Sequence, residues 1–238
     1  RLFSEIIAIW IITFWKSIGS PKKFNILELG AGNGEMMKVI ISTLKNFPEC
    51  FNNCKFLIHE KSTFLKKQQH KNLKLENVIW KNDIKKLNSY PTIFLANEFF
   101  DALPIKQFFK KNKGWVERFV NLEESDQAKF EEQFIDIKKI EKELNFEISK
   151  DQKIIEYSPS SFEYLKDICS IINKNNGGLL IVDYGYFNSK MHETLQAINK
   201  HKYSNVLEDI GQSDITYNIN FNIFKKYIDQ FDDLNSIF

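Results

Sequence analysis

Short apolar runs recur along the chain, and each ends at glycine or polar residues. These runs predict strands at residues 26–29, 56–59, 78–80, 92–96 and 179–182. Between the first two strands, Met37, Ile40, Ile41 and Leu44 are spaced as one face of a helix, and residues 159–172 show similar helical spacing. Strands that alternate with helices are typical of a parallel sheet. The pattern therefore predicts an α/β fold.

The segment between the fourth and fifth strands has a different pattern. Residues 105–109 and 115–120 are separated by Lys-Lys-Asn-Lys-Gly, which predicts a β-hairpin. The charged stretch 123–153 contains no comparable run of core residues. We therefore expect a single domain over residues 1–238 that carries an inserted, substrate-facing subdomain at about residues 105–153.

The apolar stretch at residues 6–15 is too short to cross a bilayer, which takes about 20 residues. It follows Ser4 and Glu5 rather than a basic segment, so it does not resemble a signal peptide. We expect a buried helix here and no membrane span.

Composition and charge exclude some classes of protein. Hydrophobic residues make up 43% of the chain and charged residues 27%, with a net charge of +2, as in an ordinary globular enzyme domain. Of the basic residues, 31 are lysine and only Arg1 and Arg118 are arginine. Bidentate readers of phosphate or guanine are therefore nearly absent, and we expect no nucleic-acid partner.

Three cysteines cannot form a closed disulfide framework, which suits a reducing compartment. Cys50 and Cys54 lack the second ligand pair of a structural zinc site, so no metal site is predicted.

The most informative motif follows the first predicted strand. Glu28 stands two residues before the alternating glycines Gly30, Gly32 and Gly34, an arrangement that suits a tight, ligand-binding turn. A dinucleotide fingerprint reads G-x-G-x-x-G, but Glu35 occupies the place of its third glycine, which disfavours NAD. The Glu28 carboxylate suits a cationic amine or sulfonium better than a pyrophosphate. The motif looks like the first motif of class I S-adenosylmethionine (SAM) methyltransferases, although a tight turn in another α/β protein is an alternative.

Further polar residues follow the second and fourth predicted strands. Glu60 ends the second, where a carboxylate commonly holds a ribose diol. Asn97, Glu98 and Asp101 follow the fourth, together with two phenylalanines. Because ligands of open α/β sheets bind at the carboxyl ends of the strands, we expect the acceptor there. A capped helix start with packed phenylalanines is the alternative interpretation.

The chain resembles the MidA-like SAM-dependent methyltransferases over nearly its whole length. The motifs that carry the resemblance are Leu2-Phe3-Ser4-Glu5, residues 27–34, His59-Glu60-Lys61-Ser62 with Leu65 and Gln68, Asn97-Glu98-Phe99-Phe100-Asp101-Ala102-Leu103-Pro104, Glu156-Tyr157-Ser158-Pro159, Val182-Asp183-Tyr184-Gly185, and residues 211–216. The string at residues 97–104 is specific to the family, whereas the glycine motif is shared by methyltransferases at large. Residues 217–220 depart from the family, which usually has a histidine-containing run there.

The resemblance implies a Rossmann-like class I SAM methyltransferase sheet with helices on both faces. It also implies that the chain is truncated at both ends, the second of them within a late helix. The family includes a mitochondrial complex I assembly factor that methylates an arginine. The implied function is therefore arginine N-methylation of a protein, with a complex I subunit as partner, in the mitochondrial matrix if the source is a eukaryote or in the cytoplasm if it is a bacterium.

Within this implied function we assign roles to individual residues. Glu98 and Asp101 are expected to be catalytic. The cofactor SAM is expected to be held by Glu28, Gly30, Ala31, Gly32, Gly34, Glu60, Asp83 and Asn97. Asp183 and Tyr184 could also reach the acceptor, whereas His59 is expected to be a packed or edge histidine rather than a base. Two alternatives stay open: a catalytically inactive assembly protein with a SAM fold, and a methyltransferase for another acceptor. The sequence does not indicate an oligomeric state.

Overall fold

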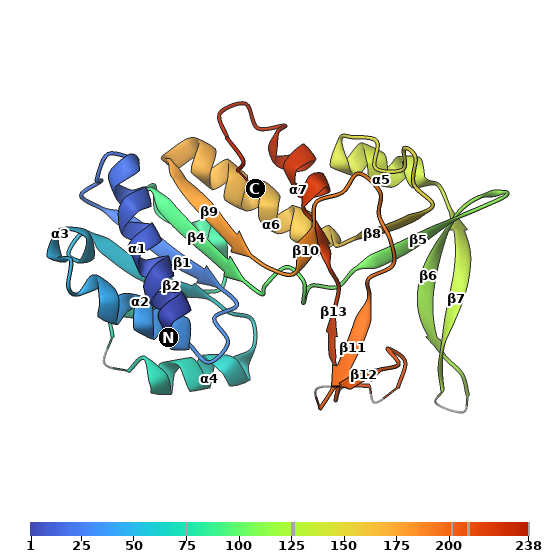
Figure 1. The fold of residues 1–238 in the computed structure, drawn as a ribbon, viewed down its shortest axis with the longest axis horizontal. Helices are drawn as coiled ribbons and strands as arrows, with labels where there is room; N and C mark the ends of the chain where they lie inside the picture. The colour runs from blue at the N-terminus through green and yellow to red at the C-terminus, as the bar shows by residue number, and fades with distance from the viewer. Residues whose placement is uncertain (75, 125–126, 201, 209, 238) are drawn as a thin grey trace. The chain divides into compact units, whose positions relative to one another are not determined.

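The computed structural model describes residues 1–74, 76–124, 127–200, 202–208 and 210–237 (Figure 1). The chain divides into two compact units. The first contains Arg1–Phe99 and Lys166–Val182, and the second contains Phe100–Leu165 and Asp183–Phe238. The residues expected to form an insertion, 105–153, all belong to the second unit. Each unit is described by itself below.

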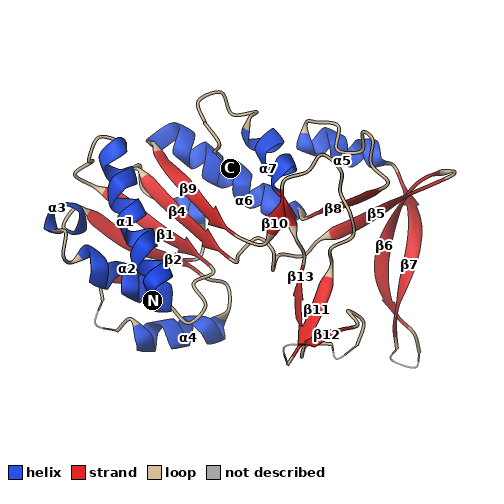
Figure 2. Ribbon diagram, in the orientation of Figure 1, coloured by secondary structure: helices blue, strands red, loops and turns tan. Residues whose placement is uncertain are grey.

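The first unit is built on a five-stranded parallel sheet in the order β3-β2-β1-β4-β9 (Figures 1 and 2). The strands are β1 (Phe24–Leu29), β2 (Cys54–His59), β3 (Val78–Lys81), β4 (Thr92–Asn97) and β9 (Gly177–Val182). The helices of this unit are α1 (Leu2–Ser17), α2 (Glu35–Leu44), α3 (Pro48–Phe51), α4 (Thr63–Asn72), the 3-10 helix η1 (Ile84–Lys86) and the later part of α6 (Pro159–Asn175). The predicted α/β fold with its parallel sheet is confirmed.

The sheet aligns the strand ends that matter for ligand binding. Leu29 at the end of β1 pairs with His59 in β2 and with Ala96 in β4, and Asn97 pairs with Val182 in β9. All six residues of β1 are buried, so the sheet is covered on both faces at its centre. The carboxyl ends of β1, β2 and β4 therefore lie next to one another at one edge of the sheet.

Helix α1 covers the predicted apolar stretch but is buried on only one side. Ile7, Ile11 and Trp15 are in the core shared with α2 and the sheet. In contrast, Ile6 is 58% exposed and Ile9 is 47% exposed. The prediction of a helix is confirmed, but the prediction that it is buried is wrong for this outer face. None of the helices in the described ranges has the length and apolar character needed to span a bilayer.

The second unit contains an antiparallel sheet in the order β7-β6-β5-β8. Its strands are β5 (Lys106–Lys111), β6 (Gly114–Leu122), β7 (Ala128–Ile135) and β8 (Ile154–Tyr157). The predicted hairpin is confirmed as β5 and β6, in which Lys111 pairs with Gly114. The charged stretch is more regular than expected, since it contains β7 and helix α5 (Ile137–Leu144).

The rest of the second unit is formed by short elements after Asp183. They are β10 (Gly185–Tyr186) paired with β14 (Ile219–Asn220), β11 (Gln196–Asn199) between β12 (Lys202–Ser204) and β13 (Asp214–Thr216), and α7 (Phe221–Ile228). The prediction that the chain ends inside a helix is wrong, because α7 ends at Ile228. Phe224 of this helix packs edge-on against Phe100 and Phe162, which gives the unit an aromatic core.

Candidate cofactor and acceptor site

The glycine turn joins β1 to α2 and brings the backbone close to a phenylalanine. Gly30 has φ +62°, a left-handed conformation that side chains with a Cβ rarely adopt. A Cβ on Gly30 would lie 2.8 Å from Cδ2 of Phe99. Ala31 is buried, and the Gly34 N–H donates to its carbonyl over 2.7 Å. The sequence therefore needs glycine at position 30 both for the backbone conformation and for the space.

Glu28 is a buried carboxyl beside this turn. Glu28 lies within β1 and is 3% exposed. Burial raises the pKa of Glu28 to about 8, although a hydrogen bond from the Met37 backbone opposes the shift. Among the described residues, none makes a hydrogen bond to Oε2 of Glu28. A buried carboxyl with an unsatisfied oxygen fits a cationic ligand group, such as the ammonium or sulfonium of SAM.

Glu60 follows β2 and is held in one orientation. Its Oε1 accepts the Ser62 backbone N–H over 2.9 Å, and its Oε2 accepts from Nε2 of Gln69 over 3.2 Å. The side chain is 8% exposed. Each carboxylate oxygen has two lone pairs, so each retains one acceptor site. Glu60 is therefore suited to accept from two neighbouring hydroxyls of a ribose.

The other two predicted cofactor residues are placed less distinctively. Asp83 caps η1, because its Oδ1 accepts the Lys85 N–H over 2.9 Å, and it lies 3.9 Å from the Lys86 ammonium. Asn97 is the last residue of β4 and is half-buried. It lines a recess of about 10 Å³ between α1 and the sheet, which is too small for a nucleoside. Neither residue has a geometry that by itself indicates cofactor binding.

Glu98 has a strained backbone at the carboxyl end of β4. Its φ is +47°, and its N–H donates to the Val182 carbonyl over 2.9 Å. Its side chain is exposed. A residue other than glycine in the left-handed region costs of order 1 kcal/mol and is found more often at functional sites. Glu98 follows β4 at the same end of the sheet as the glycine turn.

Asp101 is part of the second unit, where it is 5% exposed. The turn that contains it is held by Asp183, whose Oδ2 accepts the backbone N–H groups of Phe100 and Asp101 over 2.9 and 3.4 Å. The Asp101 carbonyl accepts the Tyr217 N–H over 3.2 Å. Glu98 and Asp101, which we predicted as a catalytic pair, thus belong to different units.

Two polar residues have roles that the sequence did not reveal. Asp183, expected only as a residue that could reach the acceptor, holds the turn at Phe100 and Asp101. Gln69 is fully buried, whereas Gln68, the glutamine that carried the family resemblance, is exposed.

The interpretation of His59 as a packed side chain agrees with its burial, which lowers its pKa, and with the 2.9 Å contact of Nδ1 with the Lys81 carbonyl.

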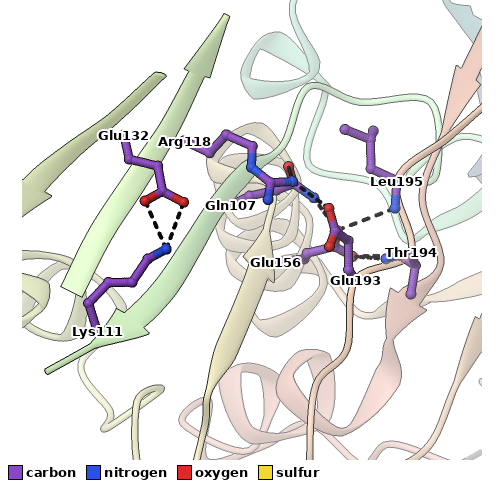
Figure 3. Close-up of polar contacts among 8 residues, drawn as sticks. All are labelled: Gln107, Lys111, Arg118, Glu132, Glu156, Glu193, Thr194 and Leu195. Atoms are coloured by element: carbon purple, nitrogen blue, oxygen red, sulfur yellow. Dashed lines mark hydrogen bonds and ion pairs between the residues drawn. The ribbon is translucent and has the colours of Figure 1, made fainter. Parts of the chain in front are cut away.

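A polar cluster in the second unit contains the Glu156 of the family motif (Figure 3). Glu156 is 4% exposed, and its Oε1 accepts from Nε2 of Gln107 over 2.7 Å. Its Oε2 accepts from the Thr194 N–H over 2.9 Å and from the Thr194 hydroxyl. Arg118 pairs with Glu193 and donates to Gln107 over 3.4 Å. These bonds join the β5–β6 hairpin to the segment before β11.

The Arg118 guanidinium is enclosed by aromatic rings as well as by this ion pair. Its Cζ lies 4.0 Å from the ring centre of Phe109 and 4.8 Å from that of Phe130. Cation–π contacts of this kind stabilise by about 0.5–1 kcal/mol each at partly exposed sites. Arg118 is therefore a structural residue of the second unit.

No group of three or more His, Cys, Asp or Glu side chains in the described ranges could hold a metal ion. The features that do point to a ligand are those of the first unit: the glycine turn after β1, the buried Glu28 and the carboxylate after β2. In a parallel sheet of this order they define a class I SAM methyltransferase fold.

The comparison with family models gives the family. Residues 6–237 match the family described as "Putative S-adenosyl-L-methionine-dependent methyltransferase", and the chain belongs to it. SAM is the cofactor of this family. The predicted family resemblance is confirmed.

The curated relatives that the chain matches are methyltransferases by name. The chain is 26% identical over 254 residues to "Protein arginine methyltransferase NDUFAF7, mitochondrial" of Xenopus tropicalis. The aligned region covers 96% of this chain and 58% of that protein. It is 25% identical over 252 residues to the human protein of the same name, covering 95% and 56%. The chain thus spans a little over half the length of these relatives.

A crystal structure of a COG1565 superfamily member from Burkholderia thailandensis, bound to S-adenosyl-homocysteine, has the same fold. Its TM-score is 0.78 at 18% identity, and the match covers 97% of this chain and 61% of that one. A second structure from the same organism matches with a TM-score of 0.79, also at 18% identity, covering 97% and 63%.

Proposed function

We propose that this protein transfers a methyl group from SAM to an arginine side chain of a protein, and that the acceptor is a subunit of respiratory complex I. Family membership supports the methyl donor. The name of the relatives, protein arginine methyltransferase NDUFAF7, supports an arginine acceptor and motivates the complex I subunit. The mitochondrial relatives favour the matrix if the source is a eukaryote, and the cytoplasm is proposed for a bacterial source.

The observation that carries the proposal is the strained Glu98 at the end of β4, on the same sheet edge as the buried Glu28 and the glycine turn. SAM would supply a methyl group on its sulfonium. An acceptor nitrogen would attack the methyl carbon in line with the C–S bond, S-adenosyl-homocysteine would leave with the electrons of that bond, and the methylated nitrogen would release one proton. In the proposed site, Glu28 lies near the cationic end of the cofactor and Glu60 accepts from its ribose hydroxyls. Gly30, Ala31, Gly32 and Gly34 provide the close backbone approach, and Asp83 and Asn97 are retained as further cofactor residues.

The acceptor poses a specific problem, because a guanidinium stays protonated with a pKa above about 12. A carboxylate at the acceptor can orient the group and stabilise its charge while one nitrogen attacks. We assign this role to Glu98, whose side chain is exposed and whose backbone has a positive φ. Asp101 is proposed as a second acidic residue of the reaction, on the strength of the motif at residues 97–104.

The test separates turnover from cofactor binding. In the full-length gene product, Glu98→Gln is expected to lower methyl transfer by about 100-fold, the range seen when one stabilising group is removed. The Kd for S-adenosyl-homocysteine, measured by isothermal titration, is expected to stay within about twofold of the wild type. Glu49→Gln, the same change at an exposed residue of the same unit, is the control and is expected to alter neither. Equal losses in turnover and binding would reassign Glu98 to the cofactor site.

The acceptor is tested by mass spectrometry of a complex I subunit isolated with and without the gene. A 14 Da difference is expected on an arginine peptide, since one methyl group replaces one hydrogen. Methylation of lysine alone would contradict the arginine assignment. Confirmed binding of S-adenosyl-homocysteine without any transfer would favour an assembly protein that has kept the fold and lost the reaction.

A further inference from the structure

Gln69 is a fully buried amide on a helix whose other residues are half-buried or exposed. Helix α4 has one buried residue, Gln69, at 0% exposure. Burying an amide without hydrogen-bond partners costs of order 1–3 kcal/mol, so such groups are normally satisfied. Gln69 makes three bonds: to Gly32, to Glu60 and to Trp80. All these residues belong to the first unit.

The chemistry of Trp80 fixes which way the amide points. Nε1 of Trp80 lies 2.8 Å from Gln69, and an indole nitrogen can only donate a hydrogen bond. The atom that faces Trp80 must therefore be Oε1 of Gln69. The two N–H groups of Gln69 then point to the Gly32 carbonyl, at 2.8 Å, and to Oε2 of Glu60, at 3.2 Å. The ring of His70 lies against Trp80 at an interplanar angle of 34°, with the ring centres 3.8 Å apart, which supports the indole.

Gln69 thus connects the glycine turn to the carboxylate that follows β2. A second amide of α4 reinforces the turn, because Nδ2 of Asn72 donates to the Asn33 carbonyl over 2.9 Å. The absence of a Cβ at Gly34 allows this approach: a Cβ there would lie 3.0 Å from Leu73 and 3.5 Å from Cγ of Gln69. Helix α4 therefore holds the turn through side chains.

The effect on Glu60 is geometric. The terminal torsion of a glutamate is broad, so a carboxylate held at one oxygen can rotate. Here the Ser62 N–H holds Oε1 and Gln69 holds Oε2, which fixes the carboxylate plane. A fixed plane is required if both oxygens are to accept from two vicinal hydroxyls at the same time.

We propose that Gln69 is a positioning residue that sets the Glu60 carboxylate for bidentate recognition of the cofactor's ribose diol. The inference rests on the proposed assignment of Glu60 to the ribose. Gln69 does not touch the cofactor in this scheme and acts on the ribose diol through Glu60. Its removal should therefore weaken recognition of the diol selectively, rather than weaken every ligand contact.

The experiment compares two ligands by isothermal titration with the full-length gene product. The ligands are S-adenosyl-homocysteine and its 2′,3′-dideoxyribose analogue. The readout is the Kd of the analogue divided by the Kd of S-adenosyl-homocysteine. Gln69→Met keeps the length of the side chain and removes its hydrogen bonds. We expect it to reduce the ratio about tenfold, the value of one hydrogen bond to a charged group, while the Kd of the analogue stays within about twofold. Gln68→Met, at the exposed neighbouring residue, should keep the wild-type ratio.

Gln69→Glu provides a second variant of nearly the same shape, which guards against a folding defect in the first. It keeps an acceptor for Trp80 but replaces the donor toward Glu60 by a second acid, so the ratio should fall in this variant as well. An unchanged ratio in folded variants, or an equal loss for both ligands, would overturn the inference and leave Gln69 a purely structural residue. If the wild type binds the ligand but does not distinguish the two riboses, Glu60 is not the diol acceptor and the inference fails with that assignment. Failure of the wild type to bind either ligand would overturn the proposed cofactor site and the inference together.

Discussion

The buried carboxyl of Glu28 makes the stability of the first unit dependent on pH. Its pKa is raised from 4.5 in the unfolded chain to about 8 in the folded protein by burial. Between these two values the folded state holds a proton that the unfolded state has released. The stabilising contribution of Glu28 to the free energy of unfolding is therefore fully present below pH 4.5. It decreases as the pH rises and is lost above about pH 8.

The size of the effect follows from linkage. Each pH unit within this window changes the free energy of unfolding by about 1.4 kcal/mol, so a rise from pH 5.5 to 7.5 lowers it by about 3 kcal/mol. Glu28→Gln has nearly the same shape and does not titrate, so this slope should disappear in the variant. His59 contributes in the opposite direction, since its pKa is lowered by burial. Because His59 is present in both proteins, its contribution drops out when the free energy of unfolding of the variant is subtracted from that of the wild type.

Urea unfolding followed by tryptophan fluorescence at several pH values between 5.5 and 7.5 measures the difference directly. The free energy of wild type minus that of Glu28→Gln should decrease by about 3 kcal/mol over this range. Glu49→Gln, at an exposed position, is the control and should run parallel to the wild type. Parallel curves for Glu28→Gln would refute the reasoning, because they would mean that Glu28 is ionised in the folded protein throughout.

Two further predictions concern stability. Gly30→Ala should lower the free energy of unfolding by about 2 kcal/mol more than Gly32→Ala. Both positions have positive φ, but only a Cβ at Gly30 would press against Phe99. Equal losses in urea unfolding would show that the Phe99 ring moves aside at no cost. Arg118→Lys should lower the free energy of unfolding by about 1–2 kcal/mol through the loss of two aromatic contacts. Lys111 forms an exposed ion pair with Glu132 (Figure 3), so Lys111→Met should cost under about 1 kcal/mol in the same assay. Similar losses for both would mean that the rings contribute nothing.

The central sheet was predictable because each of its strands contains a mainly apolar run that is bounded by glycine or polar residues. The strands at residues 26–29 and 92–96 are nearly all buried, and such runs have few alternatives in an α/β protein. In contrast, β7 was missed because its side chains are half-buried or exposed along its whole length. A strand without a buried face has no apolar alternation to reveal it.

The candidate site was predictable where a motif is local and not where it depends on packing. The glycine turn and Glu60 stand at strand ends that the sequence marks clearly. Gln69 was not distinguished from Gln68, because α4 is mostly polar, although Leu65 and Leu73 stand four residues before and after Gln69 and mark its face as the inward one. The assignment of Asp101 to a second compact unit likewise depends on long-range contacts made after the motif, such as that with Tyr217.

The scarcity of arginine has a practical consequence for measuring the proposed reaction. Within residues 1–238, only Arg1 and Arg118 could be modified, and Arg118 is enclosed by two phenyl rings and Glu193. Among these residues, self-modification at arginine would thus fall on Arg1, whereas 31 lysines are spread along them. After labelling, hydrolysis to free amino acids would therefore report methylarginine from the acceptor with little background from residues 1–238, and label on lysine would expose side reactions of these residues.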